Sequence, residues 1–192
     1  MRVIAGSARR LNLVTPKGMD TRPTGDKIKE TLFNILSPYL YGIDFLDLYA
    51  GSGGIGIEAL SRGAAGAVFI EKNKEAVSCI KKNLATTHFE DRADVICSDV
   101  CAALYNLTPK RAYGIVFMDP PYGQGLEQPT LSVLANSKII DEDTLIIVES
   151  NTDTDFTFAQ KLGFDVTRIK RYKNNMHVFM RLSKGDAPKE TE

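Results

Sequence analysis

A glycine-rich loop that links an apolar segment to a helical segment constrains the fold of this chain more than any other feature. Residues 45–49, Phe-Leu-Asp-Leu-Tyr, favour a buried strand, and Gly51, Gly53 and Gly56 follow at the start of a predicted helix that runs to Ser61. Glycines at this spacing let the backbone turn sharply and approach a ligand closely. A strand, such a loop and a helix form the first part of a β-α-β unit, so this feature predicts an open α/β sheet.

The rest of the chain continues this alternation. We expect six further strands, at 67–71, 93–97, 114–118, 144–149, 164–171 and 176–182. We expect five further helices, at 26–36, 75–84, 100–106, 127–135 and 156–162. Thr24 and Asn73 are predicted helix N-caps, and residues 2–5 and 11–14 are predicted to form a small N-terminal hairpin. The pattern therefore predicts a seven-stranded, mostly parallel sheet with the last strand antiparallel and helices on both faces.

Length and composition indicate one main domain. A chain of 192 residues with 43% hydrophobic content can bury a sizeable core. We expect a basic extension over residues 1–24, an α/β domain over 25–184 and a flexible tail over 185–192. Because no run of about eighteen apolar residues and no secretory leader is visible, we expect a soluble, cytoplasmic protein with no membrane partner.

Basic residues gather near both ends of a chain whose net charge is zero. Residues 1–36 hold seven lysines and arginines against three acids, and residues 168–184 hold six against none. Two basic ends suit a polyanionic partner such as nucleic acid, and solvated charged faces are the alternative. Lys27 and Lys29 are expected on the outer face of the first helix.

The glycine loop admits two cofactors. Glu71 lies 20 residues after Gly51, at the end of the next predicted strand, which meets the dinucleotide-binding fingerprint and makes a nicotinamide oxidoreductase a competing interpretation. Asp47, in the strand before the loop, would repel a pyrophosphate but attract the ammonium group of an amino-acid ligand. S-adenosylmethionine has a cationic amino acid, a ribose and an adenine but no phosphate. We therefore predict S-adenosylmethionine as the cofactor.

Acids at three successive strand ends define the predicted cofactor site. We expect Asp47 near the methionyl amine, Glu71 on the ribose hydroxyls, and Asp99 on the adenine amine with Val100 beside the ring. The predicted cofactor-binding residues are Asp47, Tyr49, Ala50, Gly51, Ser52, Gly53, Glu71, Lys72, Asp99 and Val100.

The sequence Asp119-Pro120-Pro121-Tyr122 ends the apolar strand at 114–118 and supplies the predicted catalytic residues. An exocyclic amine on a nucleobase is a poor nucleophile because its lone pair is delocalised into the ring. If the Asp119 carboxylate and the Pro120 carbonyl accept hydrogen bonds from the two N–H groups of the amine, the nitrogen lone pair is directed outward. The prolines hold both acceptors rigidly. Tyr122 offers a face on which an unstacked base can lie.

Metal chemistry is not expected. When S-adenosylmethionine gives its methyl group to an amine, the leaving group is a neutral thioether, which needs no metal ion. His88 and His177 are isolated in the sequence, which favours structural roles. Cys79, Cys97 and Cys101 are odd in number and lack paired close spacing, so we expect reduced core thiols rather than disulfides or a zinc site.

These motifs resemble a known family. Segment 47–54, Asp-Leu-Tyr-Ala-Gly-Ser-Gly-Gly, together with Asp-Pro-Pro-Tyr at 119–122, resembles the S-adenosylmethionine-dependent methyltransferases that modify exocyclic nitrogens. Segment 22–36 closely resembles the RsmD family, bacterial methyltransferases of guanine N2 in small-subunit ribosomal RNA. The resemblance implies a Rossmann-like methyltransferase fold and, as partner, ribosomal RNA within the small subunit or an assembly intermediate. Because no long exposed apolar helix is predicted, we expect a monomer.

The predicted RNA-binding residues are Arg9, Arg10, Arg22, Thr24 and Lys27. The arginines and the lysine would hold the RNA backbone by charge, while Arg22 could instead pin its own loop through a salt bridge. Other functions stay open: methylation of adenine N6 in DNA or RNA, methylation of a protein glutamine, and a non-catalytic RNA-binding assembly factor with the same fold.

Overall fold

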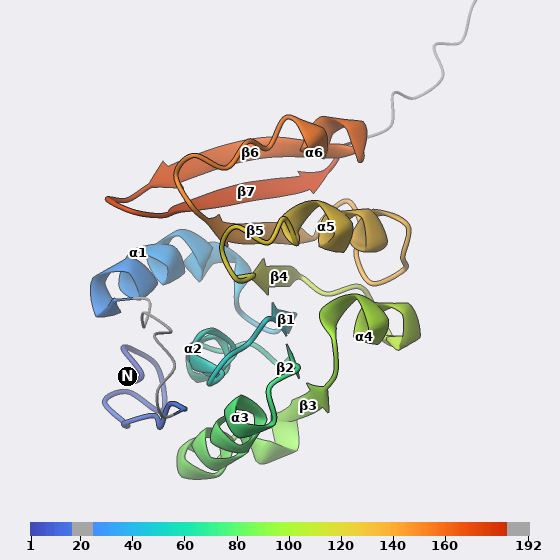
Figure 1. Cartoon of the computed structure of the whole chain (residues 1–192). Helices are drawn as coiled ribbons and strands as arrows, with labels where there is room; N and C mark the ends of the chain where they lie inside the picture. Colours follow the sequence, from blue (N-terminus) through green and yellow to red (C-terminus); the bar gives the residue numbers. More distant parts are fainter. Residues whose placement is uncertain (17–24, 184–192) are drawn as a thin grey trace, which may run out of the picture.

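In a computed structural model, which describes residues 1–16 and 25–183, seven strands form one sheet in the order β3-β2-β1-β4-β5-β7-β6 (Figure 1). The strands are β1 (Asp44–Leu48), β2 (Gly66–Glu71), β3 (Ala93–Cys97), β4 (Ile115–Met118), β5 (Leu145–Ser150), β6 (Phe164–Arg171) and β7 (Met176–Leu182). β1 to β5 pair in parallel, and β7 is antiparallel to both β5 and β6. The predicted mostly parallel sheet with an antiparallel last strand is confirmed.

The helices cover both faces of this sheet (Figure 1). They are α1 (Asp26–Leu36), α2 (Gly54–Ser61), α3 (Lys74–Thr87), α4 (Val100–Asn106), α5 (Glu127–Ala135) and α6 (Phe158–Lys161), with short 3-10 turns η1 (Ser37–Tyr39) and η2 (Glu90–Arg92). Helices α1, α2 and α3 pack on one face through a core that includes Phe69, Phe117 and Ile147. Helices α4, α5 and α6 pack on the other through residues such as Met118 and Val148. Consecutive strand residues thus alternate between two cores.

The strand order reverses between β1 and β4. β1 pairs with β2 on one side and with β4 on the other, and the chain reaches these neighbours by separate helical crossovers. In open α/β sheets, ligands bind at the carboxyl ends of the strands beside such a reversal. The fold therefore directs attention to the segments that follow β1 and β4.

The N-terminal segment is a hairpin-like loop that is bound to the domain. Arg2 and Asn12 form a single antiparallel bridge rather than regular strands. The backbone N–H groups of Ile4 and Ala5 donate to the Glu58 carboxylate of α2, at 2.8 and 3.0 Å. The two segments lie antiparallel as predicted but pair through one bridge instead of forming strands, and these hydrogen bonds fix them to α2.

We expected Lys29 on the outer face of α1, and this prediction is wrong. Lys29 is fully buried. It lies one turn before Leu32 and Phe33 and so shares their buried face. Its Nζ donates to the carbonyl of Arg2 at 2.6 Å and lies 3.2 Å from the Glu58 carboxylate. This pairing offsets the cost of burying the ammonium group.

Other differences from the predicted elements are local. β1 ends at Leu48 because Tyr49 adopts a left-handed conformation, with φ 58°. Gly25, not Thr24, is the N-cap of α1, and Thr24 lies outside the described residues. Helix α6 has only four residues, and Cys97 is exposed rather than in the core. In the described part of the chain, no helix is long and apolar enough to cross a membrane.

Candidate active site

A pocket of about 740 Å³ opens where the parallel strands end. Its wall includes the glycine loop after β1, the ends of β2 and β5, the segment after β4 and the turn between β6 and β7. Residues from opposite ends of the chain, such as Met1 and Asn175, also line it. The pocket therefore lies at the reversal of strand order described above.

Four buried or partly buried acids line this pocket: Glu71 ends β2, and Asp47, Asp119 and Glu149 lie on or just after the adjacent strands β1, β4 and β5. Asp47 pairs with Phe117, and Phe117 pairs with Ile147, so these three side chains share a face. Asp119 and Glu149 each lie two positions further along and return to that face. Asp47, Asp119 and Glu149 therefore lie on one face of the sheet.

Asp47 joins the end of β1 to helix α2. Its Oδ2 accepts a hydrogen bond of 2.8 Å from the backbone N–H of Gly56. Burial raises the pKa of the Asp47 carboxyl to about 8, opposed by this hydrogen bond and assisted by the charge of Glu71. Glycine is required at position 56 because a Cβ there would lie 2.3 Å from the Phe69 ring.

Glu71 binds the backbone of the glycine loop, as Asp47 binds the backbone of α2. Its Oε2 accepts from the N–H of Gly51 at 2.9 Å, and its Oε1 accepts from the N–H of Asn73 at 2.8 Å. Gly51 has φ 55°, a left-handed conformation that favours glycine. The Gly51 N–H of the loop is thus held by a carboxylate rather than directed at an anion.

Asp119 to Tyr122 leave β4 and turn into the pocket. The Asp119 N–H donates to the carbonyl of Leu48 at 3.4 Å, which continues the pairing of β4 with β1. Burial, followed by the negative charges of Glu149 and Asp47, raises the pKa of the Asp119 carboxyl well above its usual range. Tyr122 is 44% exposed, and its hydroxyl donates to Glu149 Oε1 at 3.2 Å. Its ring is therefore accessible while its hydroxyl is fixed.

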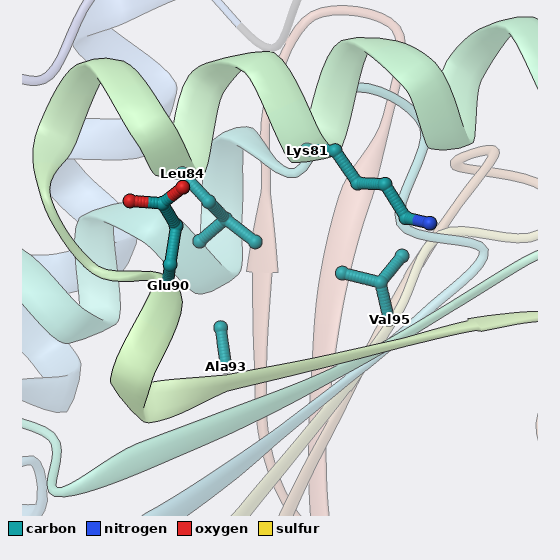
Figure 2. Close-up of a pocket in the computed structure, with 5 residues that line it drawn as sticks. All are labelled: Lys81, Leu84, Glu90, Ala93 and Val95. Carbon is teal, nitrogen blue, oxygen red and sulfur yellow. The ribbon is translucent and has the colours of Figure 1, made fainter.

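A second pocket of about 300 Å³ lies between α3, η2 and β3 (Figure 2). Its lining is Lys81, Leu84, Glu90, Ala93 and Val95. Lys81 and Glu90 extend away from each other over an apolar floor, so no polar groups converge there. Within residues 1–16 and 25–183, no three His, Cys, Asp or Glu side chains are grouped so that they could hold a metal ion. The strand-end pocket, by contrast, brings acids, prolines and aromatic rings together in one wall.

A comparison with known proteins decides the family. The family model described as Conserved hypothetical protein 95, which represents the RsmD family, matches residues 1–181. The chain belongs to the RsmD family.

Three relatives illustrate the extent of the similarity. The chain is 40% identical over 154 residues to "Ribosomal RNA small subunit methyltransferase D" of Escherichia coli K12, covering 80% of this chain and 76% of the relative. It is 36% identical over 182 residues to "Putative rRNA methyltransferase YlbH" of Bacillus subtilis, covering 90% and 98%. The solved structure "Putative methyltransferase yhhF from Escherichia coli" superimposes with a TM-score of 0.81 at 33% identity, covering 95% and 98%. The Rossmann-like methyltransferase fold implied by the motifs is confirmed.

Most site residues predicted for this RsmD-family chain meet in one pocket. Its wall includes all four residues from Asp119 to Tyr122. It also includes eight of the predicted cofactor residues, namely Asp47, Tyr49, Ala50, Gly51, Ser52, Glu71, Lys72 and Val100. Gly53 and Asp99 are not part of the wall. Gly53 is the buried N-cap of α2, and Asp99 caps α4 by accepting from the N–H of Ala102 at 3.2 Å.

Three of the predicted RNA-binding residues, Arg9, Arg10 and Lys27, do not line the pocket. Arg9 and Arg10 are exposed on the N-terminal hairpin, and Lys27 is exposed in the first turn of α1. Arg22 and Thr24 fall outside the described residues. Whether these side chains contact RNA stays a prediction.

The prediction from sequence omitted Glu149, the fourth acid of the pocket wall. A signal was available, because Glu149 stands near the carboxyl end of a predicted strand, as Asp119 does. Its partners Asn175 and His177 come from the last hairpin, which the sequence does not link to this site. Only the insertion of β7 beside β5 brings them together.

Proposed function

We propose that this chain transfers the methyl group of S-adenosylmethionine to the N2 amine of a guanine in small-subunit ribosomal RNA. The observation that carries the proposal is one pocket whose wall contains both the glycine loop, with Asp47 and Glu71, and the Asp119-Pro120-Pro121-Tyr122 segment. The names of the relatives above, which describe methyltransferases of ribosomal RNA, support the substrate class. Such a substrate implies a cytoplasmic protein.

The acids of the pocket favour a cationic, phosphate-free cofactor. The N–H groups of Gly51 and Gly56 are engaged by Glu71 and Asp47, so they are not directed at a pyrophosphate. An ionised carboxylate has about four acceptor sites. Glu71 uses two of them on backbone N–H groups, which leaves two for a pair of ribose hydroxyls. Asp47 would attract the methionyl ammonium group, whose charge in turn favours the ionised carboxylate.

The bound cofactor would supply an electrophilic methyl group and leave as a neutral thioether, the methylated amine would release one proton to Asp119 or to water, and the chain would prepare the nucleophile. Asp119 and the Pro120 carbonyl would accept hydrogen bonds from the two N–H groups of the guanine amine and so direct its lone pair outward. Because the prolines restrict the backbone, these acceptors hold their positions as positive charge develops on the amine. The accessible ring of Tyr122 would stack on the extruded base.

RNA would be held by basic residues around the pocket. Arg9, Arg10 and Lys27 are exposed on the N-terminal side. Arg168 and Arg171 are exposed on β6, at the edge of the sheet. Contacts of this kind fix the position of RNA without reading its sequence. We propose that the protein acts as a monomer on a ribosomal particle or an assembly intermediate.

Labelled S-adenosylmethionine and small-subunit particles that lack the modification test the proposal. Transfer that yields N2-methylguanosine supports it, whereas N6-methyladenosine indicates the adenine alternative. Cofactor binding without transfer indicates a non-catalytic assembly factor. Asp119→Ala should abolish transfer while leaving cofactor affinity largely intact, and Asp91→Ala, at an exposed acid that does not line the pocket, is the matched control.

A further inference from the structure

Glu149 is a buried acid of the pocket that the proposed chemistry does not use. In the pairing of β5 with β4, Val148 lies opposite Met118, so the next residues along these two strands are Glu149 and Asp119. Neighbouring strands lie about 4.8 Å apart. The charge of Glu149 also contributes to the raised pKa of Asp119. The two carboxyl groups are therefore close enough to contact adjacent atoms of one base.

Three donors hold the Glu149 carboxylate in one orientation. Its Oε1 accepts from the Tyr122 hydroxyl at 3.2 Å and from the Asn175 amide at 2.5 Å. Its Oε2 lies 2.9 Å from Nε2 of His177, and Nδ1 of that ring lies 3.3 Å from the Tyr172 hydroxyl. Every group is satisfied when Tyr172 donates to Nδ1 and the neutral imidazole donates from Nε2. Glu149 is then an ionised group that only accepts hydrogen bonds.

The hydrogen bonds of Glu149 leave one acceptor site unused. An ionised carboxylate has about four such sites, two on each oxygen. Oε1 receives two donors and Oε2 receives one, so the remaining site is on Oε2. The side chain is only 4% exposed and yet belongs to the pocket wall. A rigid acceptor of this kind suits an N–H group of a bound ligand.

Guanine presents such an N–H beside its N2 amine. Its N1 carries a hydrogen, whereas N1 of adenine carries a lone pair. On the basis of the proposed function, we propose that Glu149 determines guanine specificity by accepting N1–H while Asp119 and Pro120 accept the N2 hydrogens. An adenine in the same position would place its N1 lone pair against the carboxylate, which is a repulsive contact. Because Tyr122 donates to Glu149, the stacking ring and the reading group are positioned together.

A base analogue separates the reading of N1 from the chemistry at N2. 2,6-Diaminopurine keeps the N2 amine but has a lone pair at N1. We would reassemble small-subunit particles with an RNA fragment that carries either guanine or this analogue at the methylated position. The wild-type kcat/KM should favour guanine by about a thousand-fold, because a site built around a hydrogen bond strongly rejects a base that cannot make it.

Glu149→Gln should reverse this preference. The glutamine oxygen can still accept from Tyr122 and Asn175, while its amide group can donate to His177 in the other tautomer and to a lone pair at N1. We expect kcat/KM to fall about a hundred-fold or more for guanine and to rise for diaminopurine. Glu142→Gln, at an exposed acid outside the pocket wall, should leave both values unchanged. Calorimetric titration with S-adenosylmethionine and thermal unfolding report whether each variant is folded.

The outcomes distinguish this inference from the proposed function. N2-methylguanosine formation with an unchanged guanine preference in Glu149→Gln, or an equal loss on both bases, overturns the role of Glu149 alone. If the Glu149→Gln variant does not fold, the wild type alone tests the inference. Equal wild-type activity on guanine and diaminopurine would then overturn the role of Glu149. If the wild type methylates no guanine in any particle, the proposed function fails and this inference fails with it.

Discussion

The carboxyl of Asp47 should make the stability of the cofactor-free protein depend on pH. Its pKa is about 8 in the folded state, against an ordinary value of 3.8, because it is buried. Between these values the folded protein keeps a proton that the unfolded chain has released, so stability falls as the pH rises. One proton corresponds to about 1.4 kcal/mol per pH unit, or about 2.7 kcal/mol between pH 5 and pH 7.

Asp47→Asn removes this proton but keeps an oxygen that can accept from the Gly56 N–H. Urea unfolding at pH 5, 6 and 7 should show a slope of unfolding free energy against pH that is less negative than in the wild type by up to about 1.4 kcal/mol per pH unit. The raised pKa of Asp119 contributes to the slope in both proteins, and because the charge of Asp47 adds to that shift, the difference reports Asp47 together with its coupling to Asp119. Glu142→Gln, at an exposed acid, should retain the wild-type slope. Parallel profiles for Asp47→Asn and the wild type would refute the reasoning.

Two further predictions concern helix α1 and the N-terminal hairpin that packs against it. Lys29→Met should lower the unfolding free energy by about 3 kcal/mol, because it removes the buried cation beside Glu58, whereas Lys27→Met at an exposed site should change it by less than about 0.5 kcal/mol. Equal effects in denaturant unfolding would contradict the assigned role of the ion pair. Charge reversal of Arg9 and Arg10 should weaken binding to ribosomal RNA and reduce its salt dependence while sparing cofactor affinity. Binding that is unchanged at every salt concentration would exclude a contact there.

The sequence was sufficient to predict how many strands follow one another along the chain and that the last one is antiparallel, but not their order in the sheet. Buried parallel strands appear as short apolar runs, and the tight turn at 173–175 required an antiparallel final pair. The pocket wall was also largely predictable, because Asp47, Glu71 and Asp119 each stand at or near the end of such a run. Local pattern was sufficient wherever the function of a residue follows from its own strand.

What could not be predicted depends on contacts between distant segments. A lysine in a helix is ordinarily exposed, and only the docking of Arg2 and Glu58 explains the burial of Lys29. Glu149 is oriented by His177, and the pairing of these two residues depends on β7 entering the sheet between β5 and β6. The left-handed turn at Tyr49 likewise has no strong sequence signal, because residues other than glycine rarely adopt it.

The buried pairing of Lys29 with Glu58 also affects how a large RNA could be aligned. Val3, Ala8 and Leu13 of the N-terminal hairpin belong to the same core as α1 and α2, so the hairpin is not a loosely tethered arm. If Arg9 and Arg10 hold the RNA backbone as proposed, they do so at a constant separation from Asp119. A rigid spacing of this kind would select the target guanine by its distance from a gripped phosphate in the folded RNA, before any atom of the base is read.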